Sequence, residues 1–502
     1  MMMDKRKLKT LLQRVESLEE FAREAEQKHK HLLDPLTIER KISACNLLHY
    51  LGIRRHDLRP IQKDLASLAI SSQSHAEAYT LNNLQKIKRL IKSLLQLNHS
   101  PEIIDALDHD KSAEIIGHNA SELLGTPSHF GQTKIMVTLP TEAATDYAFV
   151  KRLVRNGMNI ARINTAYDDQ DTWSKMIDHC KRAGAELGFS VKIYMDLIGP
   201  RIRIGELATT SIVYTKKDKP AIHLHKGDKL KIFRQRTEEP LLNEPAVTLS
   251  LQELFDVIDK NEKIWFDEGK MGGVIRSKDL NQIVVEITNA PEKGFKLKEG
   301  KGINLPDSIF ELPALTEIDL TNLPFIAAHA DMLGFSFVRT VGDIIQLQQA
   351  LKKLGKEDIG IILKIETRVS FDNLPSLLFQ VMQSKKAGVM IARGDLAVEL
   401  GMVRMAEVQE EILWLAEAAH LPVVWATQIL DTQVKKGTPT RAEISDVVKA
   451  TRSECIMLNK GMYVVDALKI LKDMDIRMYR HEVKEHKMLR ALHVAQNFLD
   501  AP

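Results

Sequence analysis

GIILKIE at residues 360–366 and AGVMIAR at residues 387–393 are the two stretches that determine the predicted fold. Each is a short apolar run that contains β-branched residues and carries charge at its C-terminal end. Buried parallel strands have such nearly continuous apolar sequences because helices cover both faces of their sheet. Residues 405–419, which follow the second run, have the apolar periodicity of an amphipathic helix. The two runs are therefore expected to be parallel strands of β–α units.

The same alternation of apolar runs and helical patterns extends over residues 133–475. Helical patterns follow nearly all of the runs, for example at 144–156, 172–187 and 463–475. Eight β–α units are the signature of a (β/α)8 TIM barrel, an α/β fold, with an open doubly wound sheet as the alternative. The six further strand candidates are residues 134–139, 159–164, 192–197, 331–338, 422–427 and 455–459.

Residues 201–300 do not follow this alternation. They contain strand patterns such as AIHLHKGDKLKIF and QIVVEIT, separated by Gly and Asp turns. We expect a small β domain inserted after the third strand, where an insertion can form a lid over an active site. The barrel is then built from two parts, residues 129–200 and residues 301–480, and residues 481–502 form a helical C-terminal tail.

Residues 1–128 are predicted to form an all-helical N-terminal extension. Two apolar stripes with helical spacing run through it, and the first has the spacing of a heptad seam. Two helices of a bundle that pack on each other explain both stripes, with a coiled coil to another chain as the alternative. The first stripe is Leu8, Leu11, Val15, Leu18, Ala22 and Ala25, and the second is Leu84, Ile87, Ile91 and Leu94.

The composition limits the classes of function. The 502 residues carry a net charge of +3, which argues against a dedicated nucleic-acid binder and gives no polybasic field for a membrane. Only three cysteines occur, and none is in a C-x-x-C pair, so neither a disulfide framework nor a thiolate zinc site is expected. No apolar run is long enough to span a bilayer, and the basic start lacks the apolar core of a signal peptide. A cytoplasmic protein is therefore predicted.

Polar residues stand at the C-terminal ends of seven of the predicted strands. In a (β/α)8 barrel these ends form the functional face. Because alternate residues of a strand point the same way, Lys364 and Glu366 should share a face, as should Arg393 and Asp395. Such a set indicates an active site rather than solvated strand ends. Its members are Arg162, Asn164, Asp196, Ser336, Arg339, Lys364, Glu366, Arg393, Asp395, Thr427, Asn459 and Lys460.

These side chains suit anionic chemistry. The carboxylates of Glu366 and Asp395, on adjacent strands, can coordinate a Mg²⁺ that keeps several waters. Lys364 and Arg162 place positive charge around the same point, and a metal with Lys and Arg beside it stabilises a transferring phosphoryl group or an enolate. Gly394 lets a ligand carboxylate approach the backbone N–H groups closely.

Taken together, these segments resemble the pyruvate kinase family over residues 133 to about 475. KGINLP, ARGDL, ATQ and PTRAE occur together and in this order, which is specific. The resemblance implies a barrel interrupted by a β lid domain, and phosphoryl transfer from phosphoenolpyruvate to ADP with Mg²⁺ or Mn²⁺. Further matching segments are TKIMVTLP, NGMNIARIN, DLIGPRIRIGEL, FDEG, GFSFVR, LKIE, WATQIL and CIMLNKG.

The resemblance also implies roles for single residues. Lys364 resembles the lysine that neutralises the moving phosphoryl group, and Arg162 resembles the arginine that contacts this group. Glu366 and Asp395 resemble the ligands of the divalent metal. Thr427 resembles the threonine near the face where enolpyruvate gains its proton. The remaining matches are Ser336, Ala392, Arg393 and Gly394 at the substrate, and Arg203, Lys301 and Asp267 at the nucleotide.

Two family motifs are altered. N-F-S-H reads NTAY at residues 164–167, and D-T-K-G-P-E reads DLIGPR at residues 196–201. Together with the helical extension and an expected lack of the family's C-terminal regulatory domain, these changes indicate an atypical member.

The altered motifs supply the site that holds K⁺ in typical members. Asn164 and Asp196 persist as a remnant of that site, but Ala166 and Leu197 have no side-chain oxygen. Arg201 stands where the family usually has a glutamate, and it is predicted to supply the positive charge in place of K⁺. Catalysis is therefore expected not to require K⁺.

The function predicted from the sequence is a pyruvate kinase-like phosphotransferase that binds phosphoenolpyruvate or pyruvate and ADP or ATP. Two alternatives stay open: a metal-dependent enolate lyase or aldolase on a similar barrel, and a non-catalytic protein that binds a phosphorylated metabolite. A homo-oligomer that binds neither nucleic acid nor membranes is expected.

Overall fold

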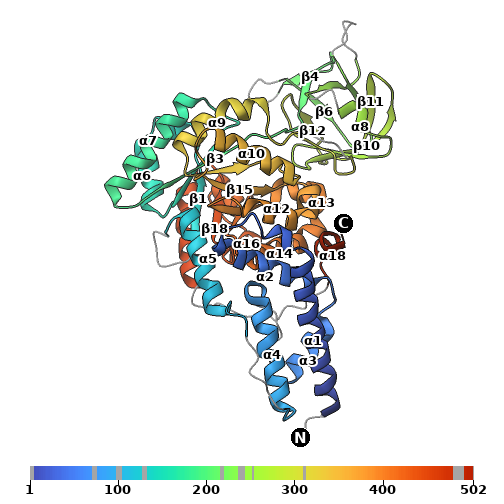
Figure 1. Ribbon diagram of the computed structural model, residues 1–502. Coiled ribbons are helices and arrows are strands. Elements are labelled where there is room, and N and C mark those ends of the chain that lie inside the picture. The colour runs from blue at the N-terminus through green and yellow to red at the C-terminus, as the bar shows by residue number, and fades with distance from the viewer. Residues whose placement is uncertain are drawn as a thin grey trace.

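Eight parallel strands close into a barrel in the computed structural model of the chain (Figure 1). Each predicted strand run contains one of them, so the predicted (β/α)8 fold is confirmed. Around the barrel β1 pairs with β2, the strands follow in chain order, and β18 pairs again with β1. The strands are β1 (Lys134–Thr138), β2 (Ile160–Asn164), β3 (Lys192–Asp196), β14 (Met332–Phe335), β15 (Gly360–Ile365), β16 (Ala387–Ala392), β17 (Val423–Ala426) and β18 (Cys455–Leu458).

The structure describes most of the chain. Within the described part, every helix is too short or too polar to cross a bilayer. Residues 479–490 of the predicted C-terminal region lie outside the described residues. The described ranges are 5–70, 76–97, 104–126, 133–214, 220–235, 243–250, 254–308, 312–478 and 491–500.

Helices surround the barrel because the strands are apolar on both faces. Strands β1, β15, β16, β17 and β18 are buried along their whole length. Helices α7, α10 and α16 begin after Asp169, Thr340 and Thr440, whose side chains accept backbone N–H groups of the first turn. The barrel helices are α6 (Tyr147–Arg155), α7 (Gln170–Leu187), α9 (Glu317–His329), α10 (Val341–Lys353), α11 (Arg368–Asp372), α12 (Leu374–Val381), α13 (Arg393–Leu400), α14 (Met402–Ala418), α15 (Asp431–Lys436), α16 (Arg441–Ala450) and α17 (Val464–Met478), with the short η3 (Thr141–Ala144).

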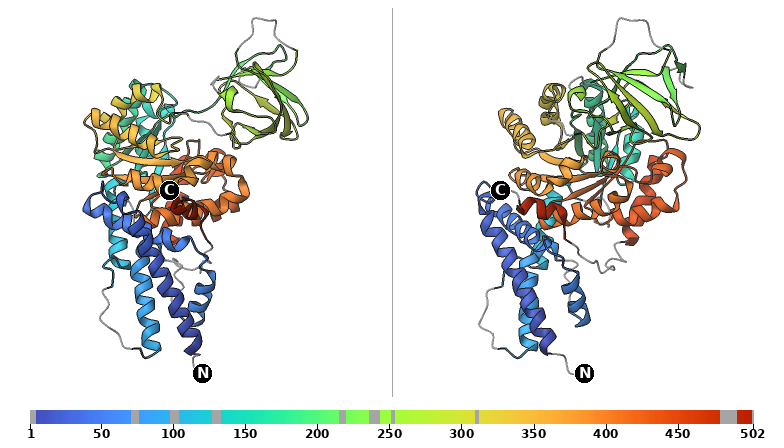
Figure 2. Two further views of the ribbon diagram at one scale, coloured as in Figure 1. Left: turned by 45° about the vertical axis from the view of Figure 1, so that its right-hand side comes forward. Right: turned by 90° about the vertical axis from the view of Figure 1, so that its right-hand side faces the viewer.

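A separate β domain, here called the lid domain, lies between β3 and α9. It has its own apolar core and projects from the end of the barrel opposite to the N-terminal helices (Figure 2). Its seven-stranded sheet has the order β13-β9-β10-β11-β7-β8-β4, and a three-stranded sheet has the order β12-β6-β5. The elements are β4 (Ile204–Leu207), β5 (Val213–Tyr214), β6 (Pro220–Leu224), β7 (Lys229–Phe233), β8 (Ala246–Leu249), α8 (Leu254–Val257), β9 (Lys263–Phe266), β10 (Met271–Lys278), β11 (Gln282–Asn289), β12 (Phe295–Leu297) and β13 (Ile303–Asn304).

The N-terminal region is a helical bundle in which α1 packs against α2 and α4. All six residues of the first predicted stripe are buried, as are Leu84, Ile87 and Ile91 of the second. The prediction is wrong for Leu94, which is 42% exposed at the end of α4. The elements are α1 (Lys5–Lys28), η1 (Lys30–Leu32), α2 (Ile38–Arg54), α3 (Arg59–Ser67), η2 (Glu77–Tyr79), α4 (Thr80–Leu94) and α5 (His109–Leu124), and α18 (His493–Asp500) packs on α2.

Buried hydrogen bonds join this bundle to the barrel. The amide of Asn46 on α2 donates to the carbonyl of Ala418 at 2.9 Å, at the end of α14. Nδ1 of His420 lies 2.9 Å from Oγ of Ser43, and its Nε2 lies 2.7 Å from the carbonyl of Ala78. Burial lowers the pKa of His420 to about 4, so the ring is neutral and donates from Nε2 to that carbonyl.

The last turn of α5 closes the N-terminal end of the barrel. Leu123 and Leu124 belong to the cluster of side chains that fills the barrel interior. A methyl group placed on Gly360 would lie 2.4 Å from Cδ1 of Leu123, and one on Gly388 would lie 2.6 Å from Cδ2. Two strands therefore carry glycine where this leucine enters, and the extension supplies part of the barrel core.

Replacement of Leu123 by Ala tests this closure. Leu123 is 2% exposed, so Leu123→Ala should destabilise the protein by about 2–5 kcal/mol, through lost burial and the cavity that remains. Leu90→Ala is the matched control, because Leu90 is 46% exposed on α4 and its loss should change stability by about 0.5 kcal/mol or less. Urea unfolding measures both, and equal losses would contradict the role of Leu123.

Candidate active site

A cavity of about 350 Å³ opens at the C-terminal rim of the barrel, beside the lid domain. Strand ends from both halves of the chain contribute to it, as the rim prediction requires. Every residue to which a role was assigned lines it, except Arg393, Lys301 and Asp267. Of the other polar residues at the predicted strand ends, Asn459 lines it, whereas Arg339 and Lys460 do not. The residues with an assigned role that line it are Arg162, Asn164, Asp196, Arg201, Arg203, Ser336, Lys364, Glu366, Ala392, Gly394, Asp395 and Thr427.

Lys364 lies at the centre of a buried cluster in the cavity wall. Its Nζ donates to Oγ of Ser336 at 2.7 Å. The same nitrogen lies 3.0 Å from Oε1 of Glu366 and 3.5 Å from Oδ1 of Asp196. Lys364 and Glu366 thus share a face of β15, as the alternation along a strand predicts.

Asp196 connects Lys364 to Arg162. Nε and Nη2 of Arg162 lie 2.7 and 2.6 Å from Oδ2 of Asp196. Nη1 of Arg162 donates to Oγ1 of Thr138 at 2.9 Å, and the hydroxyl of Tyr194 donates to Oδ1 of Asp196 at 2.6 Å. Neither Thr138 nor Tyr194 was predicted from the sequence. Tyr194 stands inside β3, before the polar C-terminal position, and Thr138 is the last residue of β1, the one barrel strand for which no polar end was assigned.

The charges of this cluster compensate one another. Burial lowers the pKa of Lys364, but the negative charges of Asp196 and Glu366 outweigh it and the pKa is raised. Burial raises the pKa of Asp196, but the positive charges of Arg162 and Lys364 outweigh it and the pKa is lowered. Arg162, Lys364 and Asp196 therefore remain ionised in the barrel interior.

Glu366 differs from the other members of the cluster, because its pKa is shifted in the direction that disfavours its charged form. Burial raises its pKa, Lys364 opposes the shift, and the nearby negative charge of Asp395 reinforces it. Oε2 of Glu366 accepts the backbone N–H of Phe337 at 2.8 Å. Two carboxylates thus face one cavity with repulsion between them, which a bound cation would relieve.

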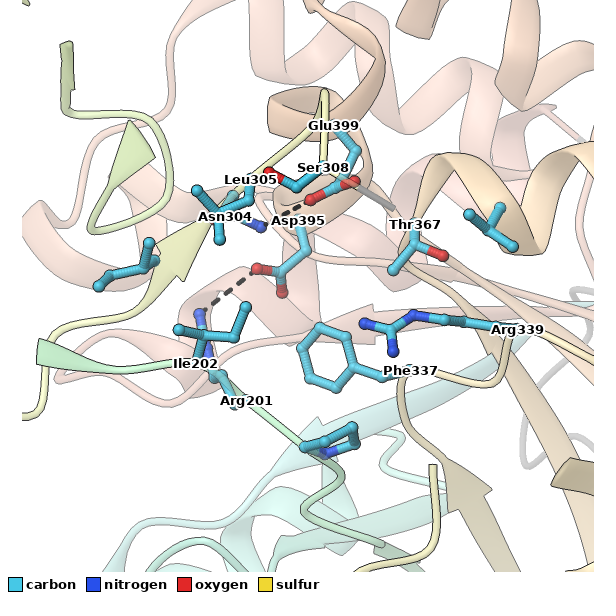
Figure 3. Close-up of a pocket in the computed structure, with 13 residues that line it drawn as sticks. Arg201, Ile202, Asn304, Leu305, Ser308, Phe337, Arg339, Thr367, Asp395 and Glu399 are labelled. Carbon is cyan, nitrogen blue, oxygen red and sulfur yellow. Dashed lines mark hydrogen bonds and ion pairs between the residues drawn. The ribbon is translucent and has the colours of Figure 1, made fainter. Parts of the chain in front are cut away.

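Arg201 contacts a different carboxylate from the one expected. The prediction that Arg201 replaces K⁺ requires its charge beside Asn164 and Asp196, but its Nη2 lies 3.4 Å from Oδ1 of Asp395 and 3.8 Å from Oε1 of Glu268 in the lid domain. Arg201 and Asp395 both line a second cavity, which is smaller than the first. Figure 3 shows their contact there, together with the hydrogen bond from Asn304 to Glu399, which stands on the same helix as Asp395, α13. The two chain segments that connect the barrel to the lid domain, one at Arg201 and the other at Asn304, therefore both contact α13.

The placement of Arg393 corrects another expectation. Its guanidinium donates to Asp446 and to the carbonyl of Thr427, both at 2.6 Å, and it does not line the cavity. The chain becomes helical at Arg393, so Arg393 and Asp395 no longer share a face. Arg393 instead supports the backbone at Thr427, which has a φ of +66° that a β-branched residue rarely adopts. Oγ1 of Thr427 accepts the backbone N–H of Gly394 at 2.9 Å.

Lys301 and Asp267 form an ion pair at 2.8 Å within the lid domain. Asp267 also pairs with Lys270 at 3.0 Å, and Lys270 lines the cavity. The predicted nucleotide residues of the lid thus lie behind the cavity wall, with Arg203 and Lys270 at the wall itself. The lining residues that the sequence analysis did not assign to the site include Tyr167, Glu268, Lys270, Gln428 and Lys435.

Protein groups contact the oxygens of Asn164 and Asp196, the two residues predicted to be the remnant of a monovalent-cation site. Oδ1 of Asn164 accepts the backbone N–H of Ala166 at 3.1 Å. Leu197 is fully buried and brings no side-chain oxygen. Each oxygen of Asp196 already has two of the contacts given above.

Comparisons with known proteins agree with this geometry. Residues 130–467 match the model of the family described as pyruvate kinase, barrel domain. A protein named pyruvate kinase from Bacillus licheniformis is 30% identical over 382 residues, which are 74% of this chain and 61% of that protein. Proteins with the same name from Dictyostelium discoideum and Thermotoga maritima are each 29% identical, over 71% and 68% of this chain and 68% and 69% of their own lengths.

Replacement of Arg393 tests its supporting role. Arg393→Met leaves the Asp446 carboxylate and the Thr427 carbonyl without their donor, and we expect a loss of about 2–3 kcal/mol in unfolding free energy. Arg477→Met is the control, because the pair of Arg477 with Asp473 is exposed and worth about 0.5 kcal/mol or less. Urea titration of both variants measures the difference, and a stability of Arg393→Met equal to that of the control would contradict the role.

Proposed function

The chain belongs to the pyruvate kinase family, and from this premise we propose that it transfers a phosphoryl group from phosphoenolpyruvate to ADP, giving pyruvate and ATP. The observation that carries the proposal is the buried cluster of Lys364, Arg162, Asp196 and Glu366 at the strand ends. The cluster holds the cations Lys364 and Arg162 at the cavity wall, and a phosphoryl group in transfer carries negative charge that such cations stabilise.

Lys364 and Arg162 bind the phosphoryl group in this proposal. Asp196 holds both cations by ion pairs and hydrogen bonds, so their positions are set before the substrate arrives. Because the cluster is buried, little water competes with the phosphoryl oxygens for these donors. Ser336, Ala392 and Gly394 line the same wall and are assigned to the substrate carboxylate.

The site fits a divalent metal. Glu366 and Asp395 face one cavity, and the negative charge of Asp395 adds to burial in raising the pKa of Glu366. Among the residues that the structure describes, no three His, Cys, Asp or Glu side chains gather into a closed metal site. Mg²⁺ suits two carboxylates of this kind, because it keeps several waters and takes other oxygens from substrate. Bound by Glu366 and Asp395, Mg²⁺ or Mn²⁺ would neutralise phosphate oxygens.

Transfer of the phosphoryl group leaves the enolate of pyruvate, which takes up a proton to become the ketone. Thr427 is assigned to the face at which this proton arrives, and its hydroxyl already accepts the N–H of Gly394. That bond leaves the Thr427 proton free to point elsewhere, since a hydroxyl donates and accepts independently. ADP is assigned to the side of the lid domain, at Arg203, with Lys301 and Asp267 behind it.

Independence from K⁺ is a further part of the proposal. Each oxygen of Asp196 is contacted by two protein donors, and the oxygen of Asn164 accepts a backbone N–H. Ala166 and Leu197 offer no side-chain oxygen to replace them. The positive charge at Asp196 comes from Arg162 and Lys364, while Arg201 lies against Asp395 and Glu268.

A cytoplasmic location and self-association remain predictions from the sequence.

Pyruvate formation in a coupled assay with lactate dehydrogenase tests the function. It should require ADP, whereas an enolate lyase would act without ADP and a binding protein would form no pyruvate.

Lys364→Met should lower kcat by about 10²–10³-fold with a smaller change in KM, because the charge is needed most in the transition state. Lys469→Met, on the exposed side of α17, is the control and should keep full activity. Near-normal turnover of Lys364→Met would refute the assignment.

The response to salt tests the K⁺ proposal. Initial rates in tetramethylammonium buffer should not change when KCl is added to about 100 mM at matched ionic strength. Arg201→Glu should lower activity, because it replaces the ion pair with Asp395 by a second negative charge beside that carboxylate. The loss should be equal with and without K⁺, since Ala166 and Leu197 still leave such an ion with too few ligands. Strong activation of the parent enzyme by K⁺, but not by Na⁺, would show the proposal to be wrong.

A further inference from the structure

We propose that Tyr194 is a positioning residue of this active site, whose hydroxyl fixes the Asp196 carboxylate and thereby the orientation of Arg162 and Lys364. The inference rests on the proposed phosphoryl transfer, because that reaction is what the two cations serve. Tyr194 does not line the cavity and acts only through Asp196.

The tyrosine reaches Asp196 from inside the barrel. Tyr194 stands two residues before Asp196 on β3, so both side chains leave the strand on the same face. Tyr194 is 0% exposed and belongs to the interior cluster that also contains Leu123 and Leu124 of α5. Its Oη lies 2.6 Å from Oδ1 of Asp196. The ring therefore packs in the barrel core while its hydroxyl touches the floor of the active site.

The bond has one direction. Burial and the negative charge of Asp196 hold the pKa of Tyr194 well above its usual value, so the hydroxyl keeps its proton. Asp196 is ionised through its contacts with Arg162 and Lys364, and an ionised carboxylate only accepts. Tyr194 must therefore be the donor, in a charge-assisted bond of the stronger kind.

The neighbouring strand leaves space for this tyrosine. Gly334 on β14 pairs with Asp196 across the barrel sheet. A methyl group on Gly334 would lie 1.8 Å from Oη of Tyr194 and 2.7 Å from Oδ1 of Asp196. Any larger residue at position 334 would thus expel the hydroxyl or the carboxylate. The combination of Tyr194 and Gly334 makes the contact possible.

The hydrogen bond from Tyr194 matters because the two carboxylate oxygens of Asp196 have different partners. Arg162 takes Oδ2 through two nitrogens, at 2.7 and 2.6 Å. Among the residues that the structure describes, Oδ1 has only the Tyr194 hydroxyl at 2.6 Å and Lys364 at the longer distance of 3.5 Å. Without the hydroxyl, Oδ1 is free to turn toward Lys364, which would draw this cation from Ser336 and rotate Oδ2 away from Arg162.

Replacement of Tyr194 by Phe removes the donor and keeps the ring in the core. We expect kcat to fall about tenfold, as for the loss of a hydrogen bond to a charged group. The KM for phosphoenolpyruvate should change by less than about twofold, because both cations remain in the site and only their orientation suffers. Tyr50→Phe is the matched control, since Tyr50 is a buried tyrosine in the N-terminal bundle whose hydroxyl contacts Arg54. It should leave kcat unchanged.

Two results would overturn the inference. One is a Tyr194→Phe enzyme with the kcat of the parent, even if its thermal midpoint falls, because that pattern belongs to a purely structural residue. The other is a crystal structure of Tyr194→Phe in which Asp196 keeps its orientation and Arg162 keeps both contacts. The crystal structure also separates this inference from the proposed function. A parent protein that forms no pyruvate would refute the function, whereas the geometry of the variant would still decide the role of Tyr194.

Discussion

The active site depends on one constraint: two cations and two carboxylates must share the barrel interior with little water. Burial of each charge is costly, and only a close partner offsets that cost. Asp196 meets this requirement for Arg162 and Lys364 together, and Glu366 adds a second partner for Lys364. Because two cations face two carboxylates, loss of any member would leave one buried charge uncompensated, so the cluster is held as a unit. The barrel fixes the positions of these side chains through its hydrogen-bonded strands. Arg162 stands on β2 and Asp196 on the neighbouring β3, while Lys364 stands on β15 and Glu366 directly after it.

Packing at the N-terminal end of the barrel supports the charged cluster at the other end. A cluster of charges at the C-terminal rim is precise only if the strands below it are well packed. One cluster of buried side chains in the barrel interior contains Leu123 and Leu124 of α5 together with Tyr194, and Tyr194 reaches Asp196. The N-terminal extension is therefore part of the support of the site, although it lies at the far end of the molecule in Figures 1 and 2. Its hydrogen bonds through Asn46 and His420 fix its place on the barrel.

The fold was predictable because buried parallel strands and amphipathic helices leave distinct patterns. The site was predictable where its residues lie within strands, since the alternation of side chains places Lys364 and Glu366 together. The prediction that Arg393 and Asp395 share a face was wrong, because a helix begins at Arg393 and the alternation of a strand no longer holds there. The partner of Arg201 could not be predicted, since the contact with Asp395 depends on how the lid domain is attached. Tyr194 escaped notice because an aromatic residue inside a strand has the pattern of a core residue, which it also is.

Asp395 links the two parts of the molecule through a single carboxylate. It lines the main cavity, where its negative charge acts on Glu366, and it holds Arg201 at the start of the lid domain. Four residues further along α13, Glu399 bonds to Asn304 at the other crossing of the chain into the lid domain. Since residues four apart lie on the same face of a helix, one face of α13 contacts both crossings. Any charge that enters the cavity near Asp395 also changes the attraction between Asp395 and Arg201, because both interactions use the same carboxylate. The electrostatics of the barrel rim and the attachment of the lid domain are therefore not independent.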